Sequence, residues 1–269
     1  METKSIPEVV LNSGHKMPML GFGTGTVPLP PHHELIPAFI NAIKVGYRHF
    51  DTAAYYGSEE SLGQAIAQAL EQVRLRQGVK AINYTNEDIL PFDMKGTWKD
   101  MEQCANLGLA KSIGLSNFGV KKISEILEYA TIPPALVQVE MNAAWHQEYL
   151  RKFCKEKGIH VSAWSPLGAN GAPWGSLAVM DNPIIKDIAI SSGKAIAQVA
   201  LRWLIEQGAT PIVKSFNKER MKKNIELFDW ELSEVDLEKI KQVSQCRGFK
   251  GERFITENGP YKTTEDLFD

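Results

Sequence analysis

The sequence has few cysteines and no motif that would pair them. Cys104, Cys154 and Cys246 are the three cysteines among 269 residues, and no C-x-x-C occurs. This spacing excludes a disulfide framework and predicts reduced thiols, as in cytosolic proteins. No apolar run approaches the ~20 residues of a membrane span, and the first ten residues, METKSIPEVV, lack the apolar core of a secretory signal. We therefore expect a cytoplasmic protein.

A strong charge imbalance is also absent, and so are several catalytic motifs. The net charge of −2 gives no indication of a nucleic-acid or anionic-membrane partner. The motifs G-x-S-x-G, H-E-x-x-H and G-x-x-x-x-G-K-[ST] do not occur, so the sequence does not support a hydrolase, a zinc enzyme or a P-loop protein. His32-His33 has neither the helical spacing of metal ligands nor nearby cysteines, and we expect no metal site.

What is present is an ordinary globular composition, with 43% hydrophobic and 23% charged residues, and a regular alternation of elements. Short apolar segments alternate with amphipathic ones, which predicts a single α/β domain, residues 1–269, with a parallel sheet and helices outside it. The expected strands lie near residue 21 and at 47–53, 111–117, 135–142, 159–168 and 210–216. The expected helices are 34–45, 58–70, 93–108, 120–130, 148–158, 194–208 and 219–228. Six strands are fewer than the eight of a closed parallel barrel.

The glycine-rich stretch LGFGTGTV (20–27) invites comparison with a dinucleotide-binding loop. It reads G-x-G-x-G rather than G-x-G-x-x-G, and the proline-rich PLPPHH follows it instead of a helix. A Rossmann loop needs that helix N-terminus to hold the pyrophosphate. The stretch is more typical of a tight turn at the end of a strand.

Chemically useful side chains collect at the expected carboxyl ends of the strands, where parallel barrels place their active sites. Taken singly, each has a structural explanation: Asp51 could cap a turn, Tyr56 could pack half-buried, and Trp164 could belong to the core. Lys214 and Arg220 could be solvated residues at the start of a helix. Taken together they indicate a site. The set comprises Asp51, Tyr56, Ser116, Asn117, Gln138, Trp164, Ser165, Leu167, Lys214, Ser215, Arg220 and Asn224.

This combination of side chains suits NADPH. Amide side chains such as Asn117 and Gln138 can hold a carboxamide, and the Trp164 indole can stack on a nicotinamide ring. Backbone amides after Ser165 can hold a pyrophosphate. Two cations, Lys214 and Arg220, can bind a 2′-phosphate, the latter through its planar guanidinium.

Several motifs, in order along the chain, resemble the aldo-keto reductase family. They are HFDTAAYYGSEESLG, IGLSNFGVKKISEIL, VQVEMN, AWSPLGANGA and IVKSFNKERMKKN. The segments LPFDMKGTWKDMEQC and ENGPYKTTEDLFD resemble the plant branch of that family, which points to plant secondary metabolism. The resemblance implies a (β/α)8 TIM barrel that reduces an aldehyde or ketone with NADPH. It implies catalytic roles for Asp51 and Tyr56. It also implies cofactor binding by Gly23, Thr24, Gly25, Asp51, Ser116, Asn117, Gln138, Trp164, Ser165, Leu167, Lys214, Ser215, Phe216, Arg220 and Asn224.

The sequence departs from the family in one region. The family's catalytic Lys lies on its third strand and its His at the end of its fourth, and neither context occurs here. The expected helix that starts at 58 runs directly into VRLRQGVKAINY, which resembles the loop after the fourth strand. We interpret this as a deletion of roughly 45–50 residues at about Gln72–Val73, which is the size of about one and a half βα units. The barrel is then expected to lack its third and fourth strands. Lys80 and His49 do not lie where they could substitute.

The missing residues leave three functional interpretations. The chain could be a carbonyl reductase with Tyr56 as proton donor and activity impaired by the loss of the Lys and His. It could be a non-catalytic relative that binds NADPH or a partner protein. It could also be a non-functional product of a splice event or gene model. For a folded chain we expect a monomer that acts on a small-molecule carbonyl substrate, without nucleic acid, membrane or metal.

Overall fold

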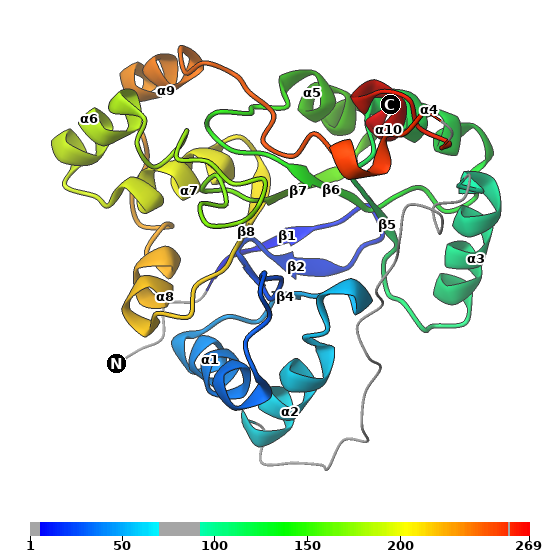
Figure 1. The fold of residues 1–269 in the computed structure, drawn as a ribbon, viewed down its shortest axis with the longest axis horizontal. Coiled ribbons are helices and arrows are strands. Elements are labelled where there is room, and N and C mark those ends of the chain that lie inside the picture. The colour runs from blue at the N-terminus through cyan, green and yellow to red at the C-terminus, as the bar shows by residue number, and fades with distance from the viewer. Residues whose placement is uncertain (1–5, 70–91, 258) are drawn as a thin grey trace.

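The computed structural model describes residues 6–69, 92–257 and 259–269, and its centre is a curled sheet of six parallel strands (Figure 1). The strands are β3 (Gly21–Gly23), β4 (Phe50–Asp51), β5 (Gly114–Ser116), β6 (Leu136–Glu140), β7 (His160–Trp164) and β8 (Ala209–Val213). Their order is β4-β3-β8-β7-β6-β5. Among the described residues the ladder therefore ends at β4 on one side and at β5 on the other.

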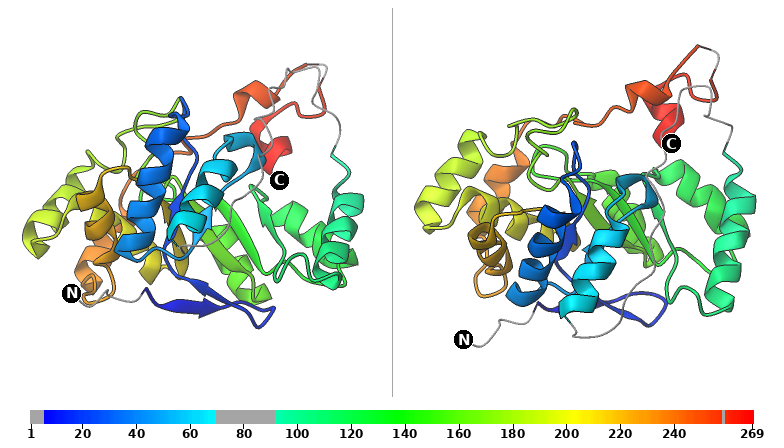
Figure 2. Two further views of the ribbon diagram at one scale, coloured as in Figure 1. Left: turned by 90° about the horizontal axis from the view of Figure 1, so that it is seen from below. Right: turned by 60° about the horizontal axis from the view of Figure 1, so that its bottom comes forward.

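Helices surround the sheet on its outer side (Figures 1 and 2). Two of them, α1 (His32–Val45) and α2 (Glu59–Ala69), flank the β4 side of the sheet. The others are α3 (Met94–Asn106), α4 (Val120–Tyr129), α5 (Glu148–Lys157), α6 (Pro183–Ser192), α7 (Ile196–Glu206), α8 (Lys218–Ile225) and α9 (Glu234–Lys241). The short helix α10 (Thr264–Phe268) lies instead at one end of the molecule, beside the start of α4, where the Gly119 N–H donates to the Phe268 carbonyl. Strand, helix, strand in sequence with a parallel sheet is the βα arrangement that the sequence predicts.

Local sequence signals account for where the helices begin and end. The Asp93 side chain accepts a hydrogen bond from the Gly96 backbone N–H at the start of α3. Asn217 accepts one from the Arg220 N–H at the start of α8. Asn, Asp and Ser in these positions satisfy backbone donors that the helix leaves unpaired. Gly158 ends α5 with φ of 67°, a left-handed conformation that glycine adopts at little cost.

The six expected strands and seven expected helices are confirmed, with strands that are shorter than the motifs predicted. Among the described residues, the sequence analysis missed five strands and α-helices: the antiparallel hairpin β1 (Glu8–Val10) and β2 (Lys16–Pro18), and the helices α6, α9 and α10. Figure 2 places the hairpin at the end of the molecule opposite α10. The start of α6 carried a usable signal, because Asn182-Pro183 is an N-cap followed by proline in the first helical turn.

The core consists of two clusters of buried apolar side chains. One cluster joins the buried faces of β5, β6 and β7 to α4–α7, with Trp203 and Leu204 of α7 among its buried members. A second cluster packs β3 and β8 against α1 and α8, where the Phe22 ring meets the rings of Phe39 and Tyr47 edge-on. Such burial of large apolar side chains is the main stabilising contribution to a domain of this size.

The predicted deletion junction at Gln72–Val73 lies outside the described residues, and so does Lys80. No single helix in the described part of the chain is long and apolar enough to cross a membrane. Only α6 and α7 taken together reach that length and composition, and they are bent by 97° at the break between them.

Candidate active site

The register of the sheet brings the predicted site residues to one rim. Gly23 lies opposite Asp51 in the β3–β4 pair, and Ser116 lies opposite Gln138 in the β5–β6 pair. Glu140 lies opposite Trp164 in the β6–β7 pair. Because all these strands are parallel, their carboxyl ends meet at the same edge, where βα loops can build a site.

Asp51 and Tyr56 are linked by a short connection at this rim. Asp51 ends β4, and Tyr56 closes a 3₁₀ turn, Ala54–Tyr56. The Tyr56 ring packs closely on Gly25, where a Cβ atom would lie 3.2 Å from the ring. Burial, followed by the negative charge of Asp51, raises the pKa of the Tyr56 phenol to about 12. The phenol therefore stays protonated at neutral pH, and it is a poor acid–base group there.

The Asp51 carboxylate is held from across the sheet by Gln138. The Gln138 Nε2 donates a hydrogen bond of 2.9 Å to Asp51 Oδ1. Burial raises the pKa of Asp51 above its usual range, whereas this hydrogen bond and the nearby His49 lower it. A buried carboxylate needs such partners to remain charged.

Asn117 and Trp164 form a pair at the β5 and β7 ends of the rim. The Trp164 Nε1 donates to Asn117 Oδ1 at 2.8 Å, and the Asn117 backbone N–H donates to the Gln138 carbonyl at 2.8 Å. Asn117 has φ of 62°, a conformation in which non-glycine residues are uncommon and often functional. Ser116 stays beside the pair, because its Oγ accepts from Asn117 Nδ2 at 3.3 Å.

The loop after β7 has an unusual backbone. Ser165, Gly168 and Ala169 have φ values of 50°, 83° and 53°. Left-handed residues turn successive backbone N–H groups toward one side and can create an anion-binding concavity. Within this loop Leu167 packs against both core clusters, and the Ser165 Oγ accepts a hydrogen bond from Trp174 Nε1 at 3.3 Å.

Cations gather where β8 leads into α8. Lys214 follows β8, and its ammonium lies 5.2 Å from the centroid of the Phe216 ring. Burial and the neighbouring charge of Arg220 lower the pKa of Lys214. The two like charges at a helix N-terminus form a place that favours an anion. Ser215 and Asn224 are buried beside them, and the Ser215 Oγ accepts from the Asn217 N–H at 3.2 Å.

The side chain of Thr24, which the resemblance places among the cofactor-binding residues, has a structural function. It is fully buried, and its hydroxyl donates to the Asp51 backbone carbonyl at 2.8 Å while its backbone N–H donates to the same oxygen at 3.0 Å. These bonds, with a 2.8 Å contact to the Ser58 hydroxyl, fix the end of β4. Its predicted contact with the cofactor stays a prediction, as does that of Gly23.

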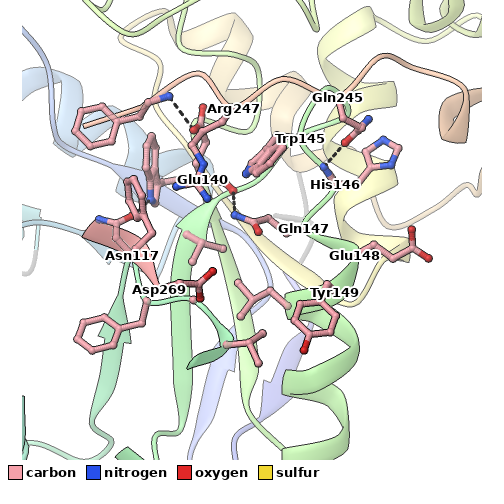
Figure 3. A pocket seen from close by; sticks show the side chains of 18 of the residues that line it. Asn117, Glu140, Trp145, His146, Gln147, Glu148, Tyr149, Gln245, Arg247 and Asp269 are labelled. Atoms are coloured by element: carbon pink, nitrogen blue, oxygen red, sulfur yellow. Dashed lines mark hydrogen bonds between the residues drawn. The ribbon is translucent and has the colours of Figure 1, made fainter. Parts of the chain in front are cut away.

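A pocket of about 480 Å³ adjoins the Asn117–Trp164 pair (Figure 3). It is lined by residues that the sequence analysis did not single out, among them Glu140, Trp145 and Arg247. The Arg247 guanidinium lies 5.3 Å from the Trp145 ring centroid. The buried Glu140 carboxylate accepts from the Gly248 and Phe249 backbone N–H groups at 3.2 and 2.9 Å. The signal in the sequence for this side of the pocket is the group of aromatic residues in NAAWHQEY.

Comparison with known sequences gives a consistent family assignment. A sequence model described as "Aldo/keto reductase family" matches residues 19–89 and 79–245. "Protein REDOX 2" of Catharanthus roseus is 48% identical to this chain over 314 aligned residues, which cover 98% of this chain and 97% of the relative. An NADPH-dependent codeinone reductase 1-4 of Papaver somniferum is 40% identical, covering 100% of this chain and 99% of the relative.

A solved structure agrees with the sequence comparison. The crystal structure of a Bombyx mori aldo-keto reductase in complex with NADP matches with a TM-score of 0.75 and 30% identity. The match covers 91% of this chain and 95% of that one. The curled sheet with outer helices is therefore shared with an NADP-bound relative.

Proposed function

Because this chain belongs to the aldo/keto reductase family, we propose that it reduces an aldehyde or ketone to an alcohol at the rim around Asp51 and Tyr56. By family it is an NADP-dependent oxidoreductase, and NADPH is its cofactor. The single observation that carries the proposal is the meeting of Asp51, Tyr56 and Gln138 on the rim that also holds Trp164, Lys214 and Arg220.

The residues present fit NADPH. Lys214 and Arg220 form a pair of like charges that would hold the 2′-phosphate, and a guanidinium binds phosphate through two parallel hydrogen bonds. The left-handed loop after Trp164 would hold the pyrophosphate, and the Trp164 ring offers a face to the nicotinamide. NADPH, when bound, supplies the hydride for the reaction.

Tyr56 would then give its phenolic proton to the oxygen of the reduced carbonyl. Asp51 stands beside it, and its carboxylate disfavours the phenolate rather than supporting it. The family's catalytic lysine, whose sequence context this chain lacks, would counter that charge. The family's histidine, whose context is also lacking, would orient the substrate. We infer that this site binds its cofactor and reduces carbonyls slowly.

The length of the alignment supports an internal deletion. REDOX 2 aligns over 314 residues, and this chain has 269, so 45 or more aligned positions have no residue of this chain. The sheet order supports it as well, because the ladder of described strands ends at β4 and β5. Two missing strands between them would leave these edges about 14 Å apart in an otherwise unchanged barrel.

The proposal is tested by following NADPH oxidation with a broad panel of aldehydes and ketones. We expect measurable but slow reduction, and we expect Tyr56→Phe to abolish it because the ring stays and the proton donor is lost. Tyr55→Phe is the matched control, since Tyr55 is the neighbouring, more exposed phenol. Residual activity that is unchanged in Tyr56→Phe would remove Tyr56 from this role.

Arg220 provides a separate test of the cofactor site. We expect Arg220→Met to weaken NADPH binding by about 10- to 100-fold, because a hydrogen bond to a charged group is worth ~1.5–3 kcal/mol. NADH binding should not change, since NADH lacks the 2′-phosphate. Titration of NADPH and NADH fluorescence measures both, with Lys222→Met as control because Lys222 pairs with Glu219 instead. Equal losses for the two cofactors would contradict the assignment.

The sequence also leaves open a non-catalytic relative that binds NADPH or a partner, and a non-functional splice or gene-model product. NADPH binding without turnover on any carbonyl would favour the non-catalytic relative. Absence of NADPH binding by the folded chain would favour the non-functional product. Sequencing the transcript across codons 72 and 73 would establish whether the deletion exists in the organism.

A further inference from the structure

The hydrogen bond between Gln138 and Asp51 joins two strands that are distant in the sheet. In the strand order, β3, β8 and β7 lie between β4 and β6. In a flat sheet, four strand spacings would separate the two residues by about 19 Å, far beyond the reach of their side chains. The 2.9 Å bond therefore exists only because the sheet curls until its two arms face each other.

The partners of Asp51 differ in which of its atoms they contact. Within the described part of the chain, it is the one side chain that donates a hydrogen bond to the Asp51 carboxylate. Thr24 bonds to the backbone carbonyl of Asp51, and His49 acts on the carboxylate through its charge alone. A half-buried carboxylate that lost this donor would keep the cost of burial without compensation.

We propose that Gln138 is a positioning residue that holds the Asp51 carboxylate and thereby braces the β4 arm of the sheet against the β6 arm. The family resemblance gives Asp51 a lysine partner from the third strand; in this structure Gln138 of β6 donates to the carboxylate. A glutamine amide is neutral, so it restrains the carboxylate without offsetting its charge. The Tyr56 phenol therefore experiences an anion that is fixed in place and not neutralised. The contact between Gln138 and Asp51 needs neither cofactor nor substrate, so it holds the two strands together whether or not the chain reduces carbonyls.

A double-mutant cycle tests the brace by chemical unfolding of the full chain at pH 7. We expect Gln138→Leu and Asp51→Leu to be coupled: the double variant should be more stable than the sum of the single effects predicts, by about 10-fold in the unfolding equilibrium constant. The control is Gln147→Leu, which removes an amide donor to the Glu140 carbonyl on the same rim. Its effect should add to that of Asp51→Leu. An additive cycle for Gln138 and Asp51 would overturn the proposal.

A second variant keeps the test decisive if a leucine variant does not fold. Gln138→Glu has the same size and puts a second carboxylate against Asp51. In the described part of the chain, His49 and Tyr56 are the titratable side chains that interact with Asp51. Two carboxylates that share a site bind a proton more readily in the folded than in the unfolded chain. Relative to the parent, this variant should be least stable at pH 8 and should recover as the pH falls toward 5. A loss of stability that does not change with pH would contradict the contact.

Discussion

Inserting the segment that we propose is deleted between residues 72 and 73 should raise carbonyl reduction by about 10²- to 10⁴-fold, the range by which a positioned acid–base group accelerates a reaction. The segment would be taken from REDOX 2, which aligns over 97% of its own length with this chain. The physical reason lies at Tyr56, whose pKa is raised to about 12 by burial and by Asp51. A lysine ammonium next to Asp51 would offset that charge and make the phenol a better proton donor. The measurement is the steady-state rate of NADPH oxidation with the same carbonyl panel.

A second chimera separates chemistry from folding. It carries the same segment, in which the lysine and the histidine that the family resemblance implies are changed to methionine and alanine, so that the two strands are inserted without these proton-transfer groups. We expect this chimera to fold at least as well as the first and to remain as slow as the parent chain. If both chimeras were equally fast, closure of the barrel rather than the two side chains would account for the gain. If both stayed slow, the proposed deletion would not account for the slow reduction that we expect of the parent chain.

Acid is expected to destabilise the protein through His160, with an effect of up to about 3 kcal/mol between pH 6.5 and pH 4. Burial, and secondarily the nearby His49, lowers the pKa of His160 from 6.5 to about 4, and its Nε2 lies 2.9 Å from the buried Thr210 hydroxyl. In this range the unfolded chain binds a proton at His160 and the folded chain does not. The stabilising contribution is thus complete above pH 6.5 and is lost as the pH falls toward 4.

The comparison of His160→Asn with the parent isolates this effect. Urea unfolding at a series of pH values should show a shallower loss of stability below pH 6.5 in the variant than in the parent. His33→Asn is the control, because its side chain is 79% exposed. Carboxylates such as Asp51 and Glu140 also titrate in acid, but they are unchanged in both variants and cancel in the comparison. Parallel curves for His160→Asn and the parent would refute the role of His160.

Most of the fold could be predicted because the sequence signals of its helices and strands are local. Helices such as α1 and α5 carry an apolar face and a glycine stop, and the strands are short apolar runs between them. The hairpin β1–β2 was missed because its three-residue strands are too short for an alternating pattern to stand out. The helix α9 was missed because its apolar face is weak, with Ile240 as its one buried residue.

The residues of the candidate site could be predicted from the sequence, but the contacts among them could not. Parallel strands present their carboxyl ends to one rim, and this rule predicts Asp51, Gln138 and Trp164 as site residues from the sequence alone. The rule says nothing about which of them touch, because that depends on how far the sheet curls. The bond between Gln138 and Asp51, and the wall that Arg247 and Trp145 add to the pocket, arise from residues 87 or more positions apart. No pattern in the sequence encodes those distances.

The pKa of the Tyr56 phenol is the most direct test of the central claim, that the rim keeps its cofactor-binding groups and has lost the cation that activates its tyrosine. It can be measured by following the ¹³Cζ resonance of labelled tyrosine through a pH titration, with Tyr56→Phe to assign the signal. The account predicts a value of about 12, well above that of a free phenol. A pKa below about 9 would require a positive charge beside the phenol and would contradict the account.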